Sequence, residues 1–517
     1  MSYDALFVSV PYTEPLPSVA PVLLSACLER DNLKAKGIDL GLHFYEEFHK
    51  KEYWPELKGQ LITGWLENNR LPKRSVIDVL KWTKKYVLDL KKKYNPRWIG
   101  LSIFTLESID FSYILIYTIR RYWPEVLIVV GGKGIESTEF KTGKNHYDQY
   151  IDMGLADLAV VGDCEHIIGK LIKEDATGVV VAPPQKKEDL DKNPIPNWEE
   201  YDLRVYNNYY DSLINEPYMA ITGSKGCIRD CTFCDVGSFW PKYIYRDPTL
   251  VANEIITGYR KTGIKAYQFT DNLVNGSVSH YYNMNEILAR EIPREIKYQG
   301  YAIFRGKQHM PEEHFELAAR AGCSSWAIGV EGGSEKVRFD MRKKVTDEDT
   351  DYSAEMLDKY NIHQKWLMMV GYPTETEADF EMTLDLMRRW AHVGKKGGIS
   401  VSFTPTFMLL HNSPLMQNTQ LVQELGLSHN VRSVWGQKFW TSTMNPDNTF
   451  PVRYDRWKRA VTLAEDLGYP WIETSPKDLW YKELDELMEI YNSKKDEIEK
   501  ELYESAKRTK IIPILQH

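Results

Sequence analysis

The chain has 517 residues, of which 43% are apolar and 27% are charged; this predicts roughly two or three domains and argues against a disordered or membrane-spanning protein. The net charge of −8 argues against a general nucleic-acid-binding protein. Because the sequence contains no run of about 18 apolar residues and no signal-peptide pattern, we expect no membrane contact, a cytoplasmic location and reduced cysteines.

Strand and helix patterns alternate over the first third of the chain. Buried strands are expected at residues 4–10, 37–44, 98–105, 126–130 and 157–161, with helices at residues 22–30, within 45–95 and from 106 to 122. This alternation predicts a doubly wound parallel α/β sheet of the Rossmann type. Such sheets bind their ligands at the carboxyl ends of the strands.

Small and polar residues stand at three of these expected strand ends. Ser102 and Thr105 close the third strand, Gly131 and Gly132 follow the fourth, and Gly162 follows the fifth. A glycine lets a ligand approach the backbone more closely than a Cβ would allow. Each glycine is equally suited to a tight strand-to-helix turn, so alone it is weak evidence of a site.

The rest of the chain divides at a proline-rich, charged segment. Residues 176–217 are expected to be a linker after a first domain of residues 1–175. Strand patterns then return at residues 218–222, 265–271, 297–305, 325–331, 363–370 and 398–404, which predicts a partial barrel of six strand–helix units over 218–410. Residues 411–517 are rich in mixed charges and are expected to be mainly helical.

Three cysteines lie close together on the loop that follows the strand pattern at 218–222. Cys227, Cys231 and Cys234 have the spacing Cys-x3-Cys-x2-Cys, and three thiolates on one short loop can hold three corners of an iron–sulfur cluster. A structural zinc site normally takes four ligands in two separated pairs. Disulfides would leave one of the three unpaired, and unrelated buried cysteines would not need this spacing. The pattern therefore favours a cluster with one open iron.

The motif Cys227-x3-Cys231-x-Phe233-Cys234 resembles the signature of the radical S-adenosylmethionine (radical SAM) enzymes. The resemblance implies that the three cysteines hold a 4Fe–4S cluster and that S-adenosylmethionine chelates the open iron. It also implies that the reduced cluster cleaves this cofactor to a 5′-deoxyadenosyl radical, and that Phe233 lies near the adenine.

Later strand ends resemble further family positions. Glu331, followed by Gly332, resembles the motif that contacts the ribose of S-adenosylmethionine, and Gly371 with Pro373 resembles the segment near the adenine. Asp271 and Arg305 stand where the family commonly places polar contacts to cofactor or substrate; Arg305 is equally suited to an ion pair.

The order of elements before residue 175 resembles the cobalamin-binding domain that precedes many radical SAM cores. The resemblance rests on the proline-rich loop after the first strand, Gly131-Gly132 after the fourth and the turn at Gly162. It implies cobalamin at Ser102, Thr105 and these glycines. No Asp-x-His-x-x-Gly motif offers a lower histidine ligand, and a sheet that has lost its ligand is the alternative.

The chain thus resembles the cobalamin-dependent radical SAM family. The resemblance implies methyl transfer to an unactivated carbon of a small-molecule or peptide substrate, with electrons from a donor such as flavodoxin or ferredoxin. A ring-forming or rearranging radical reaction is the alternative. A tRNA methylthiotransferase would need three more cysteines in the first domain, where only Cys27 and Cys164 are present. In a non-catalytic cobalamin-binding or redox-sensing protein, the residues at the later strand ends would have no reason to resemble the family's motifs.

Overall fold

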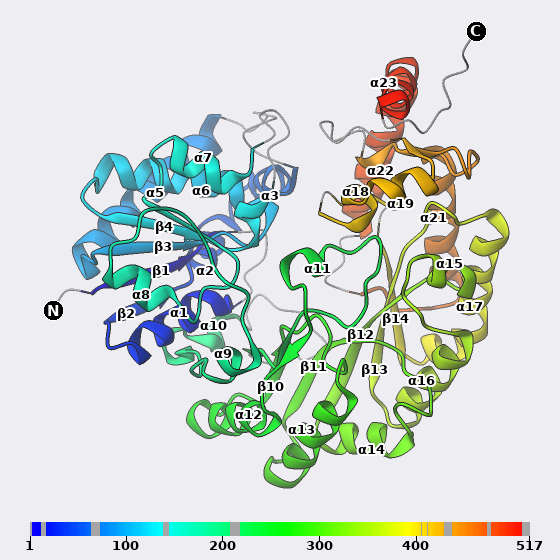
Figure 1. Cartoon of the computed structure of the whole chain (residues 1–517), viewed down its shortest axis with the longest axis horizontal. Coiled ribbons are helices and arrows are strands. Elements are labelled where there is room, and N and C mark those ends of the chain that lie inside the picture. Colours follow the sequence, from blue (N-terminus) through cyan, green and yellow to red (C-terminus); the bar gives the residue numbers. More distant parts are fainter. Residues whose placement is uncertain are drawn as a thin grey trace. The chain divides into compact units, whose positions relative to one another are not determined.

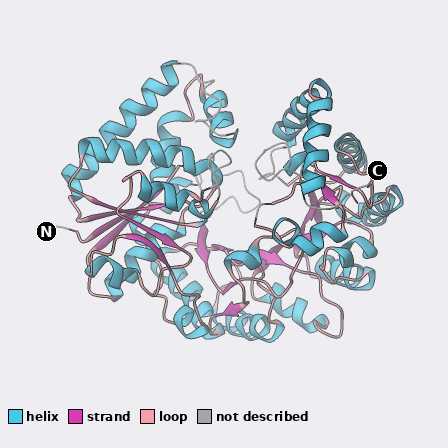
Figure 2. Cartoon of the chain, turned by 45° about the horizontal axis from the view of Figure 1, so that its top comes forward, coloured by secondary structure: helices cyan, strands magenta, loops and turns pink. Residues whose placement is uncertain are grey.

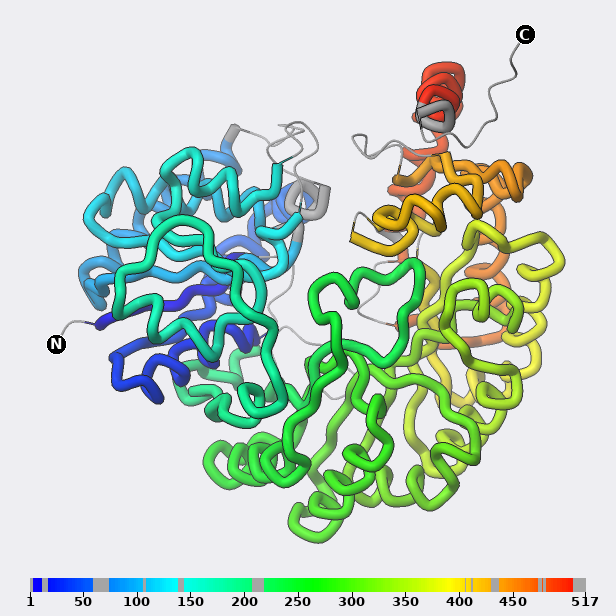
Figure 3. Tube along the Cα trace, viewed as in Figure 1, coloured from blue at the N-terminus to red at the C-terminus, as the bar shows by residue number. Residues whose placement is uncertain are grey.

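A computed structural model of the protein describes residues 3–11, 17–63, 73–137, 144–206, 218–404, 406–410, 412–428, 437–472 and 477–508. The chain forms two compact units, residues 1–220 and 221–517. Figure 3 traces both units by residue number.

The first unit contains a six-stranded sheet with the strand order β2-β1-β3-β4-β5-β6, and all its pairs are parallel. Its strands are β1 (Ala5–Ser9), β2 (Ala35–Ile38), β3 (Trp98–Ser102), β4 (Leu127–Gly131), β5 (Leu158–Val161) and β6 (Gly178–Val181). Its longer helices are α1 (Val19–Arg30), α2 (Leu40–Phe48), α3 (Trp54–Thr63), α5 (Lys73–Tyr94), α6 (Leu106–Tyr122), α7 (His146–Asp152) and α8 (Ile168–Lys173). Helices cover both faces of the sheet (Figures 1 and 2).

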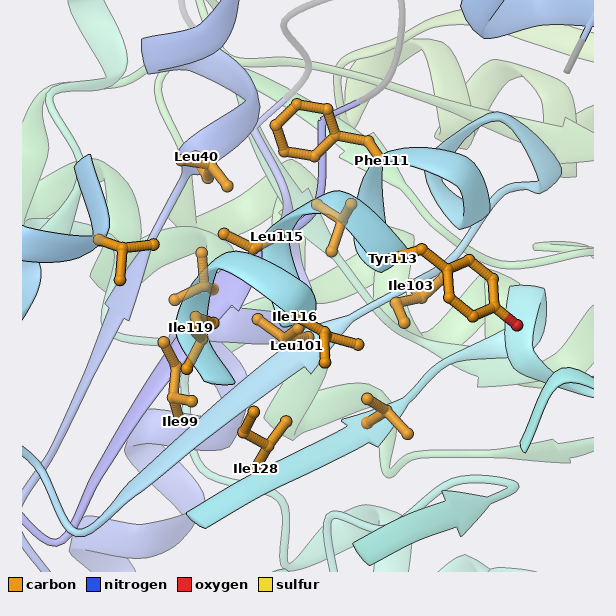
Figure 4. Close-up of a cluster of buried hydrophobic side chains, with 14 of the residues drawn as sticks. Leu40, Ile99, Leu101, Ile103, Phe111, Tyr113, Leu115, Ile116, Ile119 and Ile128 are labelled. Carbon is orange, nitrogen blue, oxygen red and sulfur yellow. The ribbon is translucent and has the colours of Figure 1, made fainter. Parts of the chain in front are cut away.

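Alternation along the strands explains this two-sided cover, because successive side chains of a strand point to opposite faces. Leu101 of β3 packs with Ile116 of α6 in one buried cluster, which Figure 4 shows. Trp98 of the same strand belongs to a second cluster on the other face, together with Leu28 of α1 and Ile168 of α8. The near-continuous apolar runs of these strands therefore reflect burial on both faces.

Two expectations for the first unit need correction. The strand expected at residues 37–44 ends at Ile38, and α2 begins at Leu40. The Asp39 side chain accepts a hydrogen bond from Leu42 N at 3.1 Å and so caps this helix. In addition, β6 pairs with β5, so part of the segment expected to be a linker completes the sheet.

A second sheet has the order β14-β13-β12-β11-β10-β7, in which β10 to β14 pair in parallel. Its strands are β7 (Tyr218–Ile221), β10 (Ala266–Phe269), β11 (Lys297–Ala302), β12 (Cys323–Glu331), β13 (His363–Met368) and β14 (Ile399–Phe403). The main helices between them are α12 (Pro248–Thr262), α13 (Val278–Glu291), α14 (Glu312–Arg320), α15 (Glu335–Asp340), α16 (Asp347–Lys359) and α17 (Glu377–Lys395). Strands β10 to β14 lie beside one another in the order of the sequence, as in a partial barrel (Figure 1). The predicted fold class is confirmed.

The C-terminal segment is mainly helical, as expected. Its helices are α18 (Pro414–Gln417), α19 (Thr419–Glu424), α21 (Phe450–Asp466), α22 (Lys477–Ser493) and α23 (Lys495–Arg508). Trp457 of α21 is buried and donates from Nε1 to the carbonyl of Phe403 at the end of β14. This segment therefore packs against the last strand. Among the described residues, no helix has both the length and the apolar character needed to cross a bilayer.

Candidate active site at the cysteine loop

The first half of the cysteine loop is anchored to the end of β10. Both carboxylate oxygens of Asp271 accept from the loop, one from Gly223 N at 2.8 Å and the other from the Ser224 hydroxyl at 2.5 Å. Asp271 is 2% exposed, and burial raises its pKa to about 7. The carboxylate that the sequence suggested as a cofactor contact is thus directed at the loop itself.

A glycine turn then leads into the first cysteine. Gly226 has φ +80°, and a Cβ on it would lie 2.5 Å from the carbonyl oxygen of Lys242, so no other residue fits without moving the neighbouring strand. Ser224 and Lys225 form β8, which pairs with β9 (Ile244–Tyr245) in an antiparallel hairpin. Arg229 N points at the Cys227 sulfur, 3.4 Å away.

The second half of the loop is held by other segments of the same unit. Thr232 N donates to the carbonyl of Met341 at 3.0 Å, and the carbonyl of Thr232 accepts from Leu415 N at 2.9 Å. Its hydroxyl lies 2.8 Å from the Tyr372 hydroxyl. Cys231 immediately precedes Thr232 and Cys234 follows two residues later, so these contacts hold the backbone between the two cysteines.

All three loop cysteines are free thiols. Burial raises the pKa of Cys231 to about 12 and raises that of Cys234, while the nearby Lys343 ammonium opposes both increases. A bound iron would deprotonate such a thiol outright, because the metal is the strongest local charge. Without a metal, burial therefore favours the protonated thiol at Cys231 and at Cys234.

Glu331 and Lys343 form a buried ion pair next to these thiols. Lys343 Nζ donates to Glu331 Oε1 at 2.5 Å, and the two side chains are 13% and 8% exposed. Glu331 has φ +67° at an irregularity in the pairing of β12 with β13. The carboxylate and the ammonium lie above Gly329, where a Cβ would come within 2.4 Å of one and 2.6 Å of the other.

Lys343 is a functional candidate that sequence reasoning missed. It stands in the run Arg342-Lys343-Lys344, and its two neighbours are exposed. Nothing in the run distinguishes the buried lysine from the others; only the folded chain brings it to Glu331.

The turn after β13 is rigidly held. Gly371 has φ +88°, and its amide donates to Oε2 of Glu375 at 2.6 Å. Pro373 lies between them, and Tyr372 reaches back to the cysteine loop through Thr232. The predicted adenine segment is therefore linked directly to the predicted cluster loop.

The remaining predicted contacts differ in their surroundings. Phe233 is half-buried and meets Phe407 edge to face, with ring centroids 6.5 Å apart. Arg305 donates from Nη2 to the carbonyls of Asn275 and Gly276, and burial lowers its pKa. The carbonyl of Gly332 accepts from the buried Arg338 at 2.7 Å.

The donor set of the loop fits an iron–sulfur cluster. Soft thiolates are the ligands that such clusters prefer, and each cysteine binds a different iron. Within the described ranges, no three His, Cys, Asp or Glu side chains are arranged to hold a single metal ion.

The predicted cobalamin residues line the carboxyl edge of the first sheet, but several have local roles. Thr105 caps α6 by accepting from Ser108 N, and the carbonyl of Ser102 accepts from Val10 N. Gly132 has φ +102°, and a Cβ there would lie 2.5 Å from the carbonyl oxygen of Ile103. A glycine is thus required at position 132 by the protein's own backbone.

Gly131 and Gly162 leave more room, since the nearest atoms to an added Cβ would be 3.6 and 3.7 Å away. Phe104 at the same edge is 63% exposed. A hollow of about 570 Å³ in this unit lies elsewhere, along β2, and is lined by none of these residues.

Residues 221–387 match the family model described as the Radical SAM superfamily, so this segment is a radical SAM domain. The chain also shares its fold with the structure of the radical S-adenosylmethionine methyltransferase TsrM from Kitasatospora setae, solved with cobalamin and a 4Fe–4S cluster. That match has a TM-score of 0.58 at 17% identity and covers 83% of this chain and 81% of that one. The resemblance to radical SAM enzymes with an N-terminal cobalamin-binding-like domain is confirmed at the level of fold.

Two curated relatives are named as methyltransferases. An uncharacterized methyltransferase of Pyrococcus horikoshii is 22% identical over 317 residues, covering 58% of this chain and 65% of that protein. The cytidylyl-2-hydroxyethylphosphonate methyltransferase of Streptomyces wedmorensis is 24% identical over 363 residues, covering 61% of this chain and 65% of that protein. The chain thus spans just under two thirds of these relatives.

Proposed function

We propose that this protein is a radical SAM enzyme whose Cys227, Cys231 and Cys234 hold a 4Fe–4S cluster, and that it methylates an unactivated carbon with the help of cobalamin. The observation that carries the proposal is the loop of three free thiols, anchored at one end by Asp271 and at the other by Thr232. When bound and reduced, the cluster supplies the electron that cleaves S-adenosylmethionine to the 5′-deoxyadenosyl radical.

The side chains around the loop have separate tasks in this proposal. The Lys343 ammonium offers a positive charge to the carboxylate of S-adenosylmethionine, while Glu331 accepts hydrogen bonds from its ribose or amino group. Phe233 and the turn from Gly371 to Pro373 border the adenine. The positions of these groups after successive strands support the assignment. Burial of the ion pair also supports it, because charges interact more strongly where the local dielectric constant is low.

The first unit is assigned to cobalamin. The carboxyl edge of the first sheet, with Gly131 and Gly162, would hold cobalamin, which when bound would supply a methyl carrier between S-adenosylmethionine and the substrate. The open backbone at Gly131 and Gly162 and the exposed Phe104 support this assignment. The name of TsrM and its bound cobalamin support it through the shared fold.

The partners follow from this chemistry. We propose a small-molecule or peptide substrate, an electron donor such as flavodoxin or ferredoxin, and a location in the cytoplasm. The cysteines form no disulfide in the described structure, which fits a reducing compartment. The net charge of −8 does not favour nucleic acid as a partner.

Anaerobic reconstitution with iron, sulfide and hydroxocobalamin, followed by product analysis with S-adenosylmethionine, tests the proposal. Formation of both 5′-deoxyadenosine and S-adenosylhomocysteine is expected. Deoxyadenosine without S-adenosylhomocysteine would favour the ring-forming or rearranging alternative. A reconstituted protein that forms neither product would contradict the assignment as a radical SAM enzyme.

A further inference from the structure

The C-terminal segment contacts the turn from Gly371 to Glu375 through four side chains. Two asparagines precede α21 and two arginines lie on its first turns; we call them the C-terminal clamp: Asn445, Asn448, Arg453 and Arg456. No role for this segment followed from sequence motifs. These four side chains contact the turn that the proposed function places beside the adenine.

The two asparagines bond the carbonyls of the turn. Asn445 Nδ2 lies 3.0 Å from the carbonyl oxygen of Pro373 and 2.9 Å from that of Glu375. Asn448 Nδ2 lies 2.8 Å from the carbonyl oxygen of Tyr372. An irregular turn between a strand and a helix cannot bond all its carbonyls within regular structure, so these groups need other donors.

The two arginines complete the clamp. Arg456 Nη1 donates to both the carbonyl and Oε2 of Glu375 at 3.2 Å, and the same Oε2 receives the Gly371 amide. Arg453 is fully buried and packs against Gly371, where a Cβ would lie 2.2 Å from Arg453 Cδ. Gly371 is thus required by this contact as well as by its φ of +88°.

The Arg453 guanidinium is held by other residues of the C-terminal segment. Its guanidinium donates to the carbonyls of Asn448, Lys438 and Trp440 at 2.6 to 3.1 Å, and it stacks over the Trp440 ring at 3.9 Å. Such a buried cation with several carbonyl partners is costly unless its geometry is maintained. The clamp is therefore a rigid support rather than a surface contact.

We propose that the C-terminal clamp positions the turn from Gly371 to Glu375 for S-adenosylmethionine, so that this segment sets the affinity for the cofactor without touching it. The inference rests on the proposed function of the turn. Small displacements of a group that contacts a cofactor are costly to binding and reaction geometry. Asn445, Asn448, Arg453 and Arg456 are positioning residues in this view.

Substitutions that keep the side-chain shape test the proposal. Asn445→Asp and Asn448→Asp replace the amide donors with oxygens that cannot donate to the carbonyls. Loss of the two hydrogen bonds of Asn445, or of the Asn448 bond to Tyr372, predicts a weakening of S-adenosylmethionine binding by about tenfold, measured by anaerobic equilibrium dialysis on the reconstituted enzyme. The KM for the cofactor should rise accordingly, while kcat at saturating cofactor, iron content and the EPR signal of the reduced cluster stay unchanged. Asn445→Gln, which keeps the donors, should restore part of the affinity.

Arg459→Gln is the matched control. Arg459 lies on the same helix but pairs with Glu377 and Glu381, outside the turn, so its loss should leave the affinity unchanged. Should Asn448→Asp fail to fold, the part-exposed Asn445→Asp decides. Unchanged cofactor affinity in the folded Asp variants, with a wild type that binds and cleaves the cofactor, overturns this inference alone. A wild type that does not bind it overturns the proposed function and the inference together.

Discussion

The Lys343 ammonium donates a hydrogen bond to Oε1 of Glu331 at 2.5 Å, and both side chains are shielded from solvent beside the cysteine loop. Burial lowers the pKa of Lys343, but the Glu331 carboxylate outweighs this effect and raises it. The Lys343 ammonium in turn opposes the rise that burial causes in the pKa of Cys231. One ion pair thus connects the strand end of β12 with the predicted cluster ligands.

Breaking this pair should be costly. Lys343→Met leaves the Glu331 carboxylate buried without its partner, so we expect a loss of about 3–5 kcal/mol in the free energy of unfolding. The double variant Lys343→Met with Glu331→Gln should recover much of that loss. Urea unfolding of the apoprotein measures all three. Lys344→Met, at an exposed position, serves as control and should change stability by less than about 1 kcal/mol; an equal cost at Lys344 would refute the special role of Lys343.

The three loop cysteines should be needed for iron, and other cysteines should not. Cys231→Ala is expected to lose nearly all of the roughly four irons per chain found after anaerobic reconstitution, because three thiolates are the protein's ligands to the cluster. Iron and sulfide analysis with the visible absorption spectrum measures this. Cys164→Ala should keep its full iron content. A Cys231→Ala protein with a full cluster and radical product would show that the central assignment is wrong.

The anchor at Asp271 should be sensitive to pH. Burial raises its pKa from 3.8 to about 7, so the folded protein binds this proton more tightly than the unfolded chain. The stability that this proton contributes is therefore fully present below about pH 4 and is lost as the pH rises towards 7, at up to about 1.4 kcal/mol per pH unit.

Asp271→Asn removes the titration while keeping the side-chain shape. The difference in unfolding free energy between wild type and variant should therefore change between about pH 4 and pH 7, with the stability of the wild type falling relative to that of the variant as the pH rises. Unfolding curves at matched ionic strength measure the difference. A difference that stays constant over this range would mean that Asp271 does not titrate there.

Gly132 should not tolerate a side chain. Its backbone has φ 102° and ψ 163°, a region that only glycine adopts readily, and an added Cβ would overlap the carbonyl of Ile103. Gly132→Ala should cost about 2–4 kcal/mol and weaken hydroxocobalamin binding. Gly154→Ala is a control, because its φ is +64° and nothing lies within 4 Å of an added Cβ. If the two variants were equally stable and bound hydroxocobalamin alike, the edge would not depend on Gly132.

Most of the architecture could be predicted because alternating strand and helix patterns are local. The strands near 98–105, 126–130 and 157–161 were found within a few residues of β3, β4 and β5. The pattern failed at residues 37–44, since an apolar run does not distinguish a strand from a buried helix, and the cap at Asp39 decided the matter. It also missed β6, whose short run lies in a segment that resembles a linker.

The grouping of the three loop thiols could be predicted from the sequence alone, because three cysteines at this close spacing lie together in any fold. The glycines at strand ends were visible for the same local reason. Other contacts became apparent only in the folded chain. Lys343 pairs with Glu331, and the Asp271 carboxylate accepts from Ser224. Asn448 and Arg456 bond the turn at Gly371. These contacts join residues 12 to 81 positions apart. Their formation depends on packing between elements, which no local pattern records.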